Sequence, residues 1–472
     1  MNSDRRNEHA AGSGAPLSTL IGSLLQRVRS RGVPRSVREI AKEHVLDGFA
    51  TMLGGASEEA SRLVRAHVAA VGGRGEAWVV GTELNKVPCQ MAALANGVQG
   101  HVLDYDDAQL TTAPGRPFGQ QVHPTTPVLA AALGLAEKNR ASGSGLLGAY
   151  VAGVEVACRL GDAVEPDHYM GGFHPTGTLG VFGATAACSY LLGLDRERTG
   201  WALGIAGGLS AGLRANRGTM AKALNAGRAA ENGVMAATLA ARGFTASTGA
   251  FEDPMGFFSA SCGSRYDRQR LRFGNPWFLR TPGIAIKRYP CAGVMHPVLD
   301  ALLALIERHR VAPNAVDRVR VHLHPEAARP LVYERPETGL QGRFSLPYTV
   351  AAALLDRGIT LAHYTDGRVR DPAVRALMPR VERVADPGLN PPGGRGASAR
   401  VELVLADGLR YYETAPASPG RRTDRRALEE KFRHCAEHAG VGKGSSLRKF
   451  VDRLWSLESV DSLAPWLRLL RA

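Results

Sequence analysis

The chain has few aromatic side chains and few cysteines for its 472 residues: aromatics make up 6% of it, and cysteine occurs six times. No two cysteines stand in CxxC spacing, which argues against a disulfide framework, a zinc knuckle or an iron–sulfur loop and favours a reducing compartment. The first residues, MNSDRRNEHAAGSGAP, lack the apolar core of a secretion signal. We therefore expect a cytoplasmic protein, with residues 1–18 as a disordered tail.

The sequence also lacks a basic stripe and a clear membrane span. Its formal net charge is +14, but the basic residues are dispersed and are not interleaved with aromatics as in single-strand-binding proteins. The uncharged stretch from Tyr169 to Leu194 contains Pro175 and many glycines, which oppose a transmembrane helix. We expect neither a nucleic acid nor a membrane as a partner.

Small apolar residues are abundant, with 55 glycines and a hydrophobic content of 44%, and they favour close helix packing. A chain of this length is expected to form two domains, or one domain with an insert. Helical apolar spacing runs from about Thr19 to Ala250, in segments such as 37–53, 89–105, 125–139 and 145–164. A passage rich in Pro, Gly and Arg then interrupts this pattern at 251–281.

The following region mixes strands with helices. Residues 316–327 alternate apolar and polar side chains as a half-buried strand does, and residues 399–415 have the pattern of a hairpin. Helical patterns occur in three further stretches, at 293–310, 346–358 and 427–472. The order along the chain is therefore helical, then mixed α+β, then helical.

His174 is an unusually placed titratable group, because it stands between glycines and Pro175 at the mouth of an Ala- and Gly-rich apolar helix. A histidine held there can transfer protons near neutral pH. The alternative is a buried structural histidine that caps this helix.

Three carboxylates lie within four residues, at Asp104, Asp106 and Asp107. Such a group can act as a general base, a metal site or a hydrogen-bonding cap at a helix end. No second metal-binding motif accompanies it, so we predict no metal. His123 opens the next helical segment, where it can help to hold an anion or serve as an N-cap.

Cationic side chains stand in two further motifs. Lys222 lies in a stretch of small residues, where it either reaches solvent or holds an anionic ligand. Lys287, Arg288 and His296 flank a turn that leads into a helix, and they form either a carboxylate clamp or a basic surface loop. We interpret Cys291, which lies between them, as buried packing and not as a nucleophile.

Five ordered strings carry a specific resemblance: NGVQGHVLDYDDA, GGFHPTGTLGVFGATAA, KALNAGRAAENG, KRYPCAGVMHPVLDAL and FSLPYTVAAALLDRG. Together they resemble the MmgE/PrpD family, whose members include 2-methylcitrate dehydratase, cis-aconitate decarboxylase and iminodisuccinate epimerase. The resemblance runs from about Val45 to Arg433. It implies a mainly α fold with an α+β insert, usually in a homodimer: a large all-helical domain formed by both chain ends, which we place at 19–270 and 412–472, and a smaller α+β lid domain at 271–411.

The resemblance also implies an active site between the two domains that needs neither a metal nor an organic cofactor. Carried over motif by motif, it predicts Asp104, His174 and Lys222 as catalytic residues. The substrate-binding candidates are His123, Lys287, Arg288, His296 and Tyr333, the last with an uncertain local match.

This sequence departs from the family pattern in several places. Ala108 stands where members commonly have Thr, and Asn225 where many have His. Ala292 occupies the position of a further histidine in decarboxylase-like members, which argues against decarboxylation. The passage between Asp107 and His123 is longer than is typical and would reshape the entrance of the pocket.

From these residues we predict a cofactor-independent lyase that dehydrates a small di- or tricarboxylate resembling 2-methylcitrate. The cations would hold carboxylates and stabilise an enediolate, with Asp104 as base and His174 as acid, or with these roles exchanged. The alternatives are an isomerase or epimerase, a decarboxylase of a related acid, and an inactive family member that serves as a binding subunit.

Overall fold

The computed structural model describes residues 15–471 except 110–121, 165, 390–397, 417–423 and 443. Most of the predicted tail, and the long passage before His123, lie outside the described residues. The tail prediction extends too far at its end, because Leu17 and Ser18 are buried and begin the first helix. Leu17 packs into an apolar cluster, so it belongs to the folded domain.

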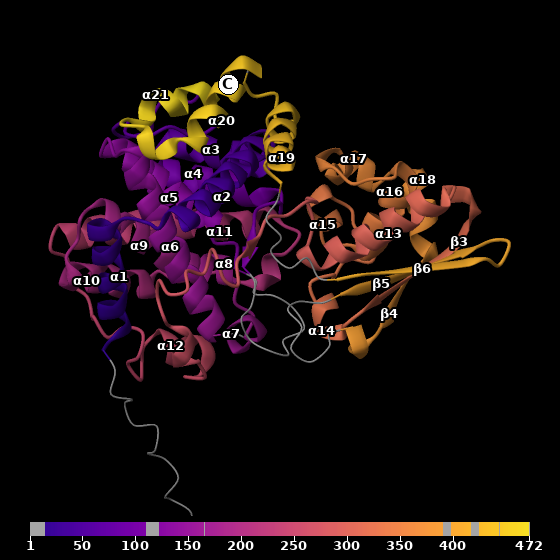
Figure 1. Cartoon of the computed structure of the whole chain (residues 1–472), viewed down its shortest axis with the longest axis horizontal. Helices are drawn as coiled ribbons and strands as arrows, with labels where there is room; N and C mark the ends of the chain where they lie inside the picture. Colours follow the sequence, from indigo (N-terminus) through magenta and orange to yellow (C-terminus); the bar gives the residue numbers. More distant parts are fainter. Residues whose placement is uncertain are drawn as a thin grey trace, which may run out of the picture.

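The larger part of the molecule is a layered helical domain (Figure 1). Its first half contains α1 (Leu17–Arg31), α2 (Arg35–Gly54), α3 (Glu59–Val71), α4 (Cys89–Val102), α5 (Thr125–Lys138), α6 (Gly143–Val164), α9 (Gly180–Leu191), α10 (Arg196–Gly208) and α11 (Met220–Ala241). The chain returns to it with α19 (Arg425–His438), α20 (Gly444–Trp455) and α21 (Leu463–Leu467). Both ends of the chain therefore build one domain, as predicted.

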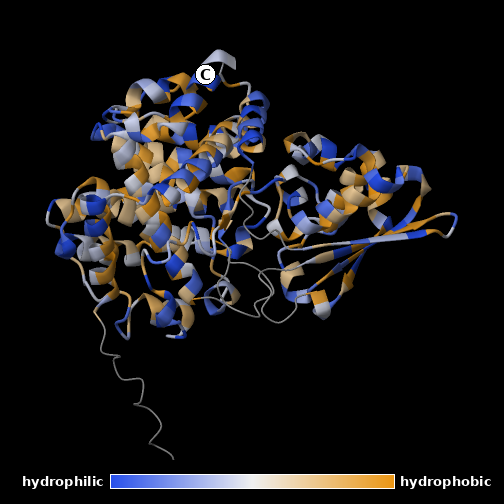
Figure 2. Cartoon of the chain, in the orientation of Figure 1, coloured by the Kyte–Doolittle hydropathy of each residue, from blue (hydrophilic) through white to orange (hydrophobic). Residues whose placement is uncertain are grey.

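Helices from the two chain ends share one apolar core. Phe450 of α20 and Trp466 of α21 pack against Phe49 of α2, with ring centroids 4.9 and 5.3 Å from it. Apolar residues dominate the central helices, whereas the outward helix α19 is largely hydrophilic (Figure 2). Burying these large rings ties the C-terminal helices to the N-terminal half of the domain.

Helices α4 and α11 approach each other closely because glycines meet at their crossing. A Cβ atom on Gly97 would lie 2.7 Å from Cα of Gly227, which is closer than a side chain tolerates. Small residues at this crossing let the two backbones touch. This approach matters for the site, because α4 carries His101 and α11 carries Lys222.

The smaller part is an α+β domain, here called the lid. Its four-stranded sheet has the order β4-β3-β5-β6, with β3 and β4 parallel and the other pairs antiparallel. The strands are β3 (Val316–Leu323), β4 (Val381–Ala385), β5 (Ala399–Leu405) and β6 (Arg410–Ala415). Helices α13 (His296–His309) and α16 (Leu346–Asp356) pack on one face of the sheet (Figure 1). The predicted hairpin is present, and it turns at Gly408 with a φ of 86°.

The boundary of the lid differs from the predicted one. Phe278, Leu279 and Ile284 pack into the core of the helical domain, and the first residue of the lid core is Cys291. Strand β2 (Ile284–Ala285) also pairs with β1 (Ala108–Gln109). At the other end β6 continues to Ala415, beyond the predicted limit at 411. The few large apolar side chains of the Pro- and Gly-rich passage belong to the helical domain.

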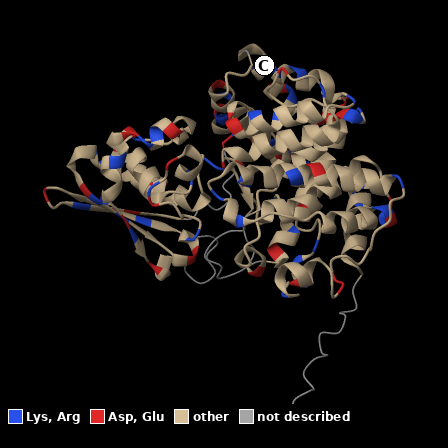
Figure 3. Cartoon of the chain, turned by 180° about the vertical axis from the view of Figure 1, so that it is seen from behind, with Lys and Arg blue, Asp and Glu red and all other residues tan. Residues whose placement is uncertain are grey.

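The uncharged stretch after Tyr169 is broken into short helices. These are α7 (Asp167–Met170), α8 (Pro175–Thr178) and α9, and none of the described helices is both long and apolar enough to cross a bilayer. Seen from behind, Lys and Arg are scattered over both domains among Asp and Glu (Figure 3). The expectation that the protein binds no nucleic acid stays a prediction.

Candidate functional site

The site begins where α4 ends. His101 lies in the last turn of this helix, and Asp104 follows it with a φ of 48°. This left-handed conformation is uncommon for a residue other than glycine, and it turns the chain sharply after the helix. As a result Asp104, Asp106 and Asp107 contact three different sets of partners.

Asp104 is held by two lysines from distant segments. Nζ of Lys222 lies 2.7 Å from its Oδ1, and Nζ of Lys287 lies 3.0 Å from its Oδ2 and 2.8 Å from its backbone oxygen. All three side chains are buried. Burial would raise the pKa of Asp104, but the two ammonium groups outweigh it and hold the pKa well below its usual value. The group therefore carries two positive charges and one negative charge.

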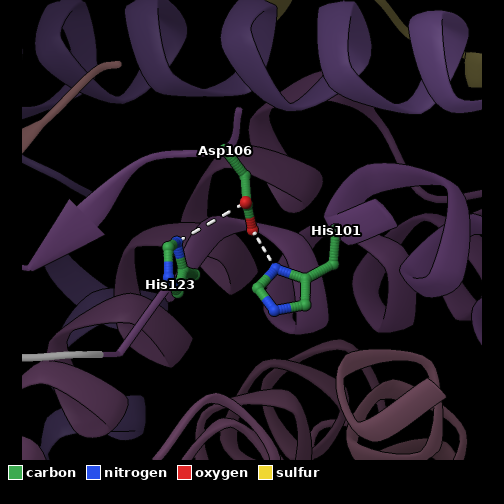
Figure 4. A group of neighbouring side chains, drawn as sticks. All are labelled: His101, Asp106 and His123. Carbon is green, nitrogen blue, oxygen red and sulfur yellow. Dashed lines mark hydrogen bonds and ion pairs between the residues drawn. The ribbon is translucent and has the colours of Figure 1, made fainter. Parts of the chain in front are cut away.

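Asp106 lies between two imidazoles (Figure 4). Its Oδ2 is 2.8 Å from Nδ1 of His101 and accepts a hydrogen bond of 2.8 Å from the Thr126 hydroxyl, while its Oδ1 is 3.5 Å from Nδ1 of His123. Burial lowers the pKa of His101, and it lowers the pKa of His123 to about 3, with Lys287 and Lys222 acting in the same direction. Both rings are therefore neutral at pH 7.

Asp107 points away from this group. It accepts hydrogen bonds from the hydroxyl and the backbone N–H of Thr125, and it lies 2.7 Å from Nδ1 of the buried His44. The three carboxylates predicted as a possible metal site therefore diverge. Asp104 lines the cavity between the domains, Asp106 contacts His101, His123 and Thr126, and Asp107 supports the start of α5.

His174 stands at the N-cap position of α8, but its side chain makes no capping hydrogen bond. Its Nδ1 is instead 3.1 Å from the amide nitrogen of Asn225, and its ring centroid lies 5.4 Å from that of His101. Burial, together with Lys222 and His101, holds the pKa of His174 well below its usual value. Asn225, one of the departures from the family pattern, is thus a direct partner of this histidine.

Three predicted binding residues lie outside this cluster. Arg288 is 51% exposed and pairs with Asp300. His296 bonds to the backbone oxygen of Tyr289 at 3.1 Å, so it holds the turn. Tyr333 donates a hydrogen bond of 2.8 Å to the backbone oxygen of Arg217, which joins the lid to the loop before α11. Arg288 therefore points away from the cluster, although the adjacent Lys287 contacts Asp104.

The structure adds two residues that we did not predict as site members. Nε2 of His101 lies 2.9 Å from Nζ of Lys222. The sequence showed only that His101 lies close to the three aspartates, and not that it contacts Lys222. Arg343 of the lid is buried and donates to the backbone oxygens of Leu103 and Pro290, at 2.5 and 2.9 Å. No sequence pattern indicated that it would reach the helical domain.

A narrow cavity lies between the two domains beside these groups. Its volume is about 10 Å³, which is room for one water molecule. It is lined by residues from both domains, among them His101, Asp104, Lys222, Leu340, Arg343 and Phe344. This cavity, as the described residues form it, is too small for a carboxylic acid of several carbons.

One set of side chains has the composition of a metal site. Donor atoms of His101, Asp106 and His123 all lie within 4.8 Å of one another and are buried. Two lysines lie close by, however, and Lys222 donates to the second nitrogen of His101, so the surrounding charge disfavours a divalent cation. The prediction that the protein needs neither a metal nor an organic cofactor stays a prediction.

The cysteines contribute no reactive group to this cluster. All six are free and buried, and burial raises the pKa of Cys291 to about 12. Its side chain belongs to the apolar core of the lid, as the sequence indicated.

Comparisons with known proteins agree with this architecture. The profile of the MmgE/PrpD N-terminal domain matches residues 20–269, and that of the MmgE/PrpD C-terminal domain matches residues 289–457. Cis-aconitate decarboxylase of Homo sapiens is 30% identical to this chain, over 81% of it and 80% of the relative. Cis-aconitate decarboxylase of Aspergillus terreus is 27% identical, over 93% and 92%. Together the two matched profiles cover most of the chain, so this chain belongs to the MmgE/PrpD family.

Proposed function

We propose that the protein is a cofactor-independent lyase that removes a proton next to a carboxylate of a small di- or tricarboxylate, with loss of water as the leading reaction. The observation that carries this proposal is the pair Lys222 and Lys287, held by the single carboxylate of Asp104 beside three neutral imidazoles. The two ammonium groups suit an anionic substrate. They also stabilise the enediolate that forms when the α-proton leaves.

The pKa directions favour one assignment of the acid and base roles. Asp104 has a strongly lowered pKa, which makes it a weak base and suits it to holding the lysines. His174 is neutral, because burial and Lys222 lower its pKa. Its Nδ1 is in contact with the Asn225 side-chain amide, and when the oxygen of that amide accepts from Nδ1–H, the lone pair on Nε2 can accept the α-proton. Of the two assignments that the sequence left open, we therefore favour the one in which His174, and not Asp104, is the base.

Lys222 is the candidate acid. Its ammonium has three N–H groups, of which one meets Asp104 and one meets His101, while its side chain also lines the cavity. Burial lowers its pKa from the usual value, so it releases a proton more readily to a departing hydroxide. In this scheme the α-proton goes to His174, the C–O bond breaks, and Lys222 protonates the leaving oxygen. Lys287 holds a substrate carboxylate.

Decarboxylation is the second candidate, because the named relatives are cis-aconitate decarboxylases. The same cations would stabilise the carbanion left when CO₂ departs. Ala292, however, is a buried alanine at the position where decarboxylase-like members have a histidine. An isomerase or epimerase would share the first step and differ only in the return of the proton.

One panel separates these reactions. The purified protein is incubated in D₂O with citrate, 2-methylcitrate, cis-aconitate and related acids, and the products are followed by NMR and by CO₂ release. An unsaturated product without CO₂ supports the dehydratase. Release of CO₂ supports the decarboxylase, and deuterated, stereochemically scrambled substrate supports the epimerase. If every acid is unchanged but citrate still raises the melting temperature, the protein is a binding subunit and the lyase proposal fails.

We also propose that the protein is a cytoplasmic homodimer. Leu213, Met220 and Leu224 lie at the start of α11 and just before it, and they are 57%, 36% and 40% exposed. Exposed apolar side chains so close in sequence favour an interface with another subunit. Leu224→Arg should then shift the mass measured by light scattering from dimer to monomer. An unchanged mass would place any interface elsewhere.

A further inference from the structure

Two buried polar atoms of the site face each other without a full hydrogen bond. Oδ1 of Asp106 and Nδ1 of His123 are each buried with no hydrogen-bond partner among the described residues, and they lie 3.5 Å apart. The other carboxylate oxygen of Asp106 is shared by His101 and Thr126. One carboxylate therefore faces the same nitrogen, Nδ1, on two different imidazoles.

The contacts of His101 fix where its proton lies. An ammonium group has only donors, so at the 2.9 Å contact with Lys222 the Nε2 atom of His101 must accept. In a neutral imidazole the other nitrogen then carries the hydrogen. Nδ1–H of His101 donates to Oδ2 of Asp106 at 2.8 Å, in agreement with this tautomer.

The same reasoning applies to His123. An ionised carboxylate is an acceptor only. The contact between Nδ1 of His123 and Oδ1 of Asp106 is therefore favourable only if Nδ1 carries the hydrogen. The neutral ring then has its lone pair on Nε2. His101 precedes residues 110–121 and His123 follows them. One carboxylate therefore sets the same tautomer in both imidazoles.

In the context of the lyase proposed above, we propose that Asp106 is a positioning residue that sets the tautomers of His101 and His123 together. It places N–H on Nδ1 of each ring and leaves each Nε2 as an acceptor. For His101 this acceptor takes one N–H of Lys222, while Asp104 takes another. With the opposite tautomer, an N–H of His101 would face an N–H of Lys222, and the lysine would lose its place beside Asp104.

The chain offers a matched control for Asp106. Asp107 is also a buried carboxylate next to Nδ1 of a buried histidine, His44, at 2.7 Å. His44 makes no described contact with Lys222, so Asp107→Asn should disturb packing and stability without changing the tautomers at the site. Asp106→Asn replaces one carboxylate oxygen by an NH₂ group, which cannot accept from either ring.

The first test reads the tautomers without using activity. The full chain is labelled with ¹⁵N-histidine, and the His101 and His123 signals are assigned with His101→Gln and His123→Gln. We expect Nδ1–H at both rings in the wild type, at least one ring switched to Nε2–H in Asp106→Asn, and no switch in Asp107→Asn. Nε2–H at His101 in the wild type, or an unaltered spectrum in Asp106→Asn, would overturn the proposal.

The second test uses kinetics. A wrong tautomer behind an otherwise intact site can lower kcat by about 10⁴-fold, so we expect Asp106→Asn to lose at least about 10³-fold in kcat with little change in KM. Asp107→Asn should keep most of its kcat per folded molecule. Equal losses in both variants would mean that Asp106 has only a structural role.

A third measurement separates positioning from metal binding. The chelator-treated wild type is dialysed against Zn²⁺ and its metal content is measured. Retention of one Zn²⁺ that Asp106→Asn abolishes would overturn the proposal, because the metal would use the same donor atoms. If the wild type transforms no polycarboxylate, the lyase proposal fails, and the ¹⁵N spectra still decide the tautomers.

Discussion

The ammonium nitrogen of Lys222 lies 2.7 Å from Oδ1 of Asp104, and both side chains are buried. The two residues are far apart in sequence, and the close crossing of α4 and α11 brings them together. A buried pair of this kind contributes little net stability, but removal of one partner leaves an uncompensated charge.

We therefore expect Asp104→Asn to destabilise the fold strongly. It would leave Lys222 and Lys287 buried without the charged carboxylate that both of them contact, and breaking a buried pair costs about 3–5 kcal/mol. Chemical denaturation measures the loss. Asp300→Asn is the control, because it removes the partner of the half-exposed Arg288 and should cost no more than about 1 kcal/mol. Equal losses in the two variants would show that Asp104 does not balance the lysines.

The histidines predict how stability depends on pH. The folded pKa is about 3 for both His123 and His296, mainly because of burial, whereas the unfolded value is about 6.5. Between these values the unfolded chain binds more protons. The protein is therefore most stable, as far as these histidines are concerned, above about pH 6.5. As the pH drops from there toward 3, the free energy of unfolding falls by about 1.4 kcal/mol per pH unit for each such histidine.

Denaturant midpoints measured from pH 7 to pH 5 test this dependence. His296→Asn removes one of these groups at a position outside the lysine-held cluster, so its stability should fall less steeply with acid than that of the wild type. An identical slope in both proteins would contradict the shift assigned to His296.

Arg343 should hold the two domains together at the site. Arg343→Ala would leave the backbone oxygens of Leu103 and Pro290 without this donor, at a cost of about 1–3 kcal/mol for each buried carbonyl. Hydrogen exchange should become faster around Asp104 and around Cys291, and Arg343→Lys should restore part of the protection. Unchanged exchange at both segments in Arg343→Ala would show that this arginine does not hold the interface.

The sequence predicted the helices well where apolar side chains recur at helical spacing over several turns. The patterns at 89–105 and 125–139 correspond to α4 and α5, and the alternating pattern at 316–327 corresponds to β3. Strand β4 was missed, because its five residues are too short to establish an alternation. The lid boundary was misplaced, because three apolar residues in a Pro- and Gly-rich passage carry the packing.

The candidate site was only partly predictable for a similar reason. A motif in the sequence indicates which residues share a turn, but not where each side chain points. Lys287 turns inward to Asp104, whereas the adjacent Arg288 turns outward to Asp300. The role of His101 depends on its contacts with Lys222 and Asp106, and the reach of Arg343 depends on how the domains meet. These are tertiary contacts that no local pattern encodes.

The central claim is that His174 takes a proton from carbon while Lys287 holds a substrate carboxylate and Lys222 protonates the leaving oxygen. The most direct measurement follows deuterium from D₂O into an acid that the wild type transforms, and the product formed from it, in the wild type and in His174→Gln. We predict that His174→Gln folds and is stabilised by citrate as the wild type is, but exchanges no α-proton and forms no product. Proton exchange or product formation at the wild-type rate in His174→Gln would contradict this account.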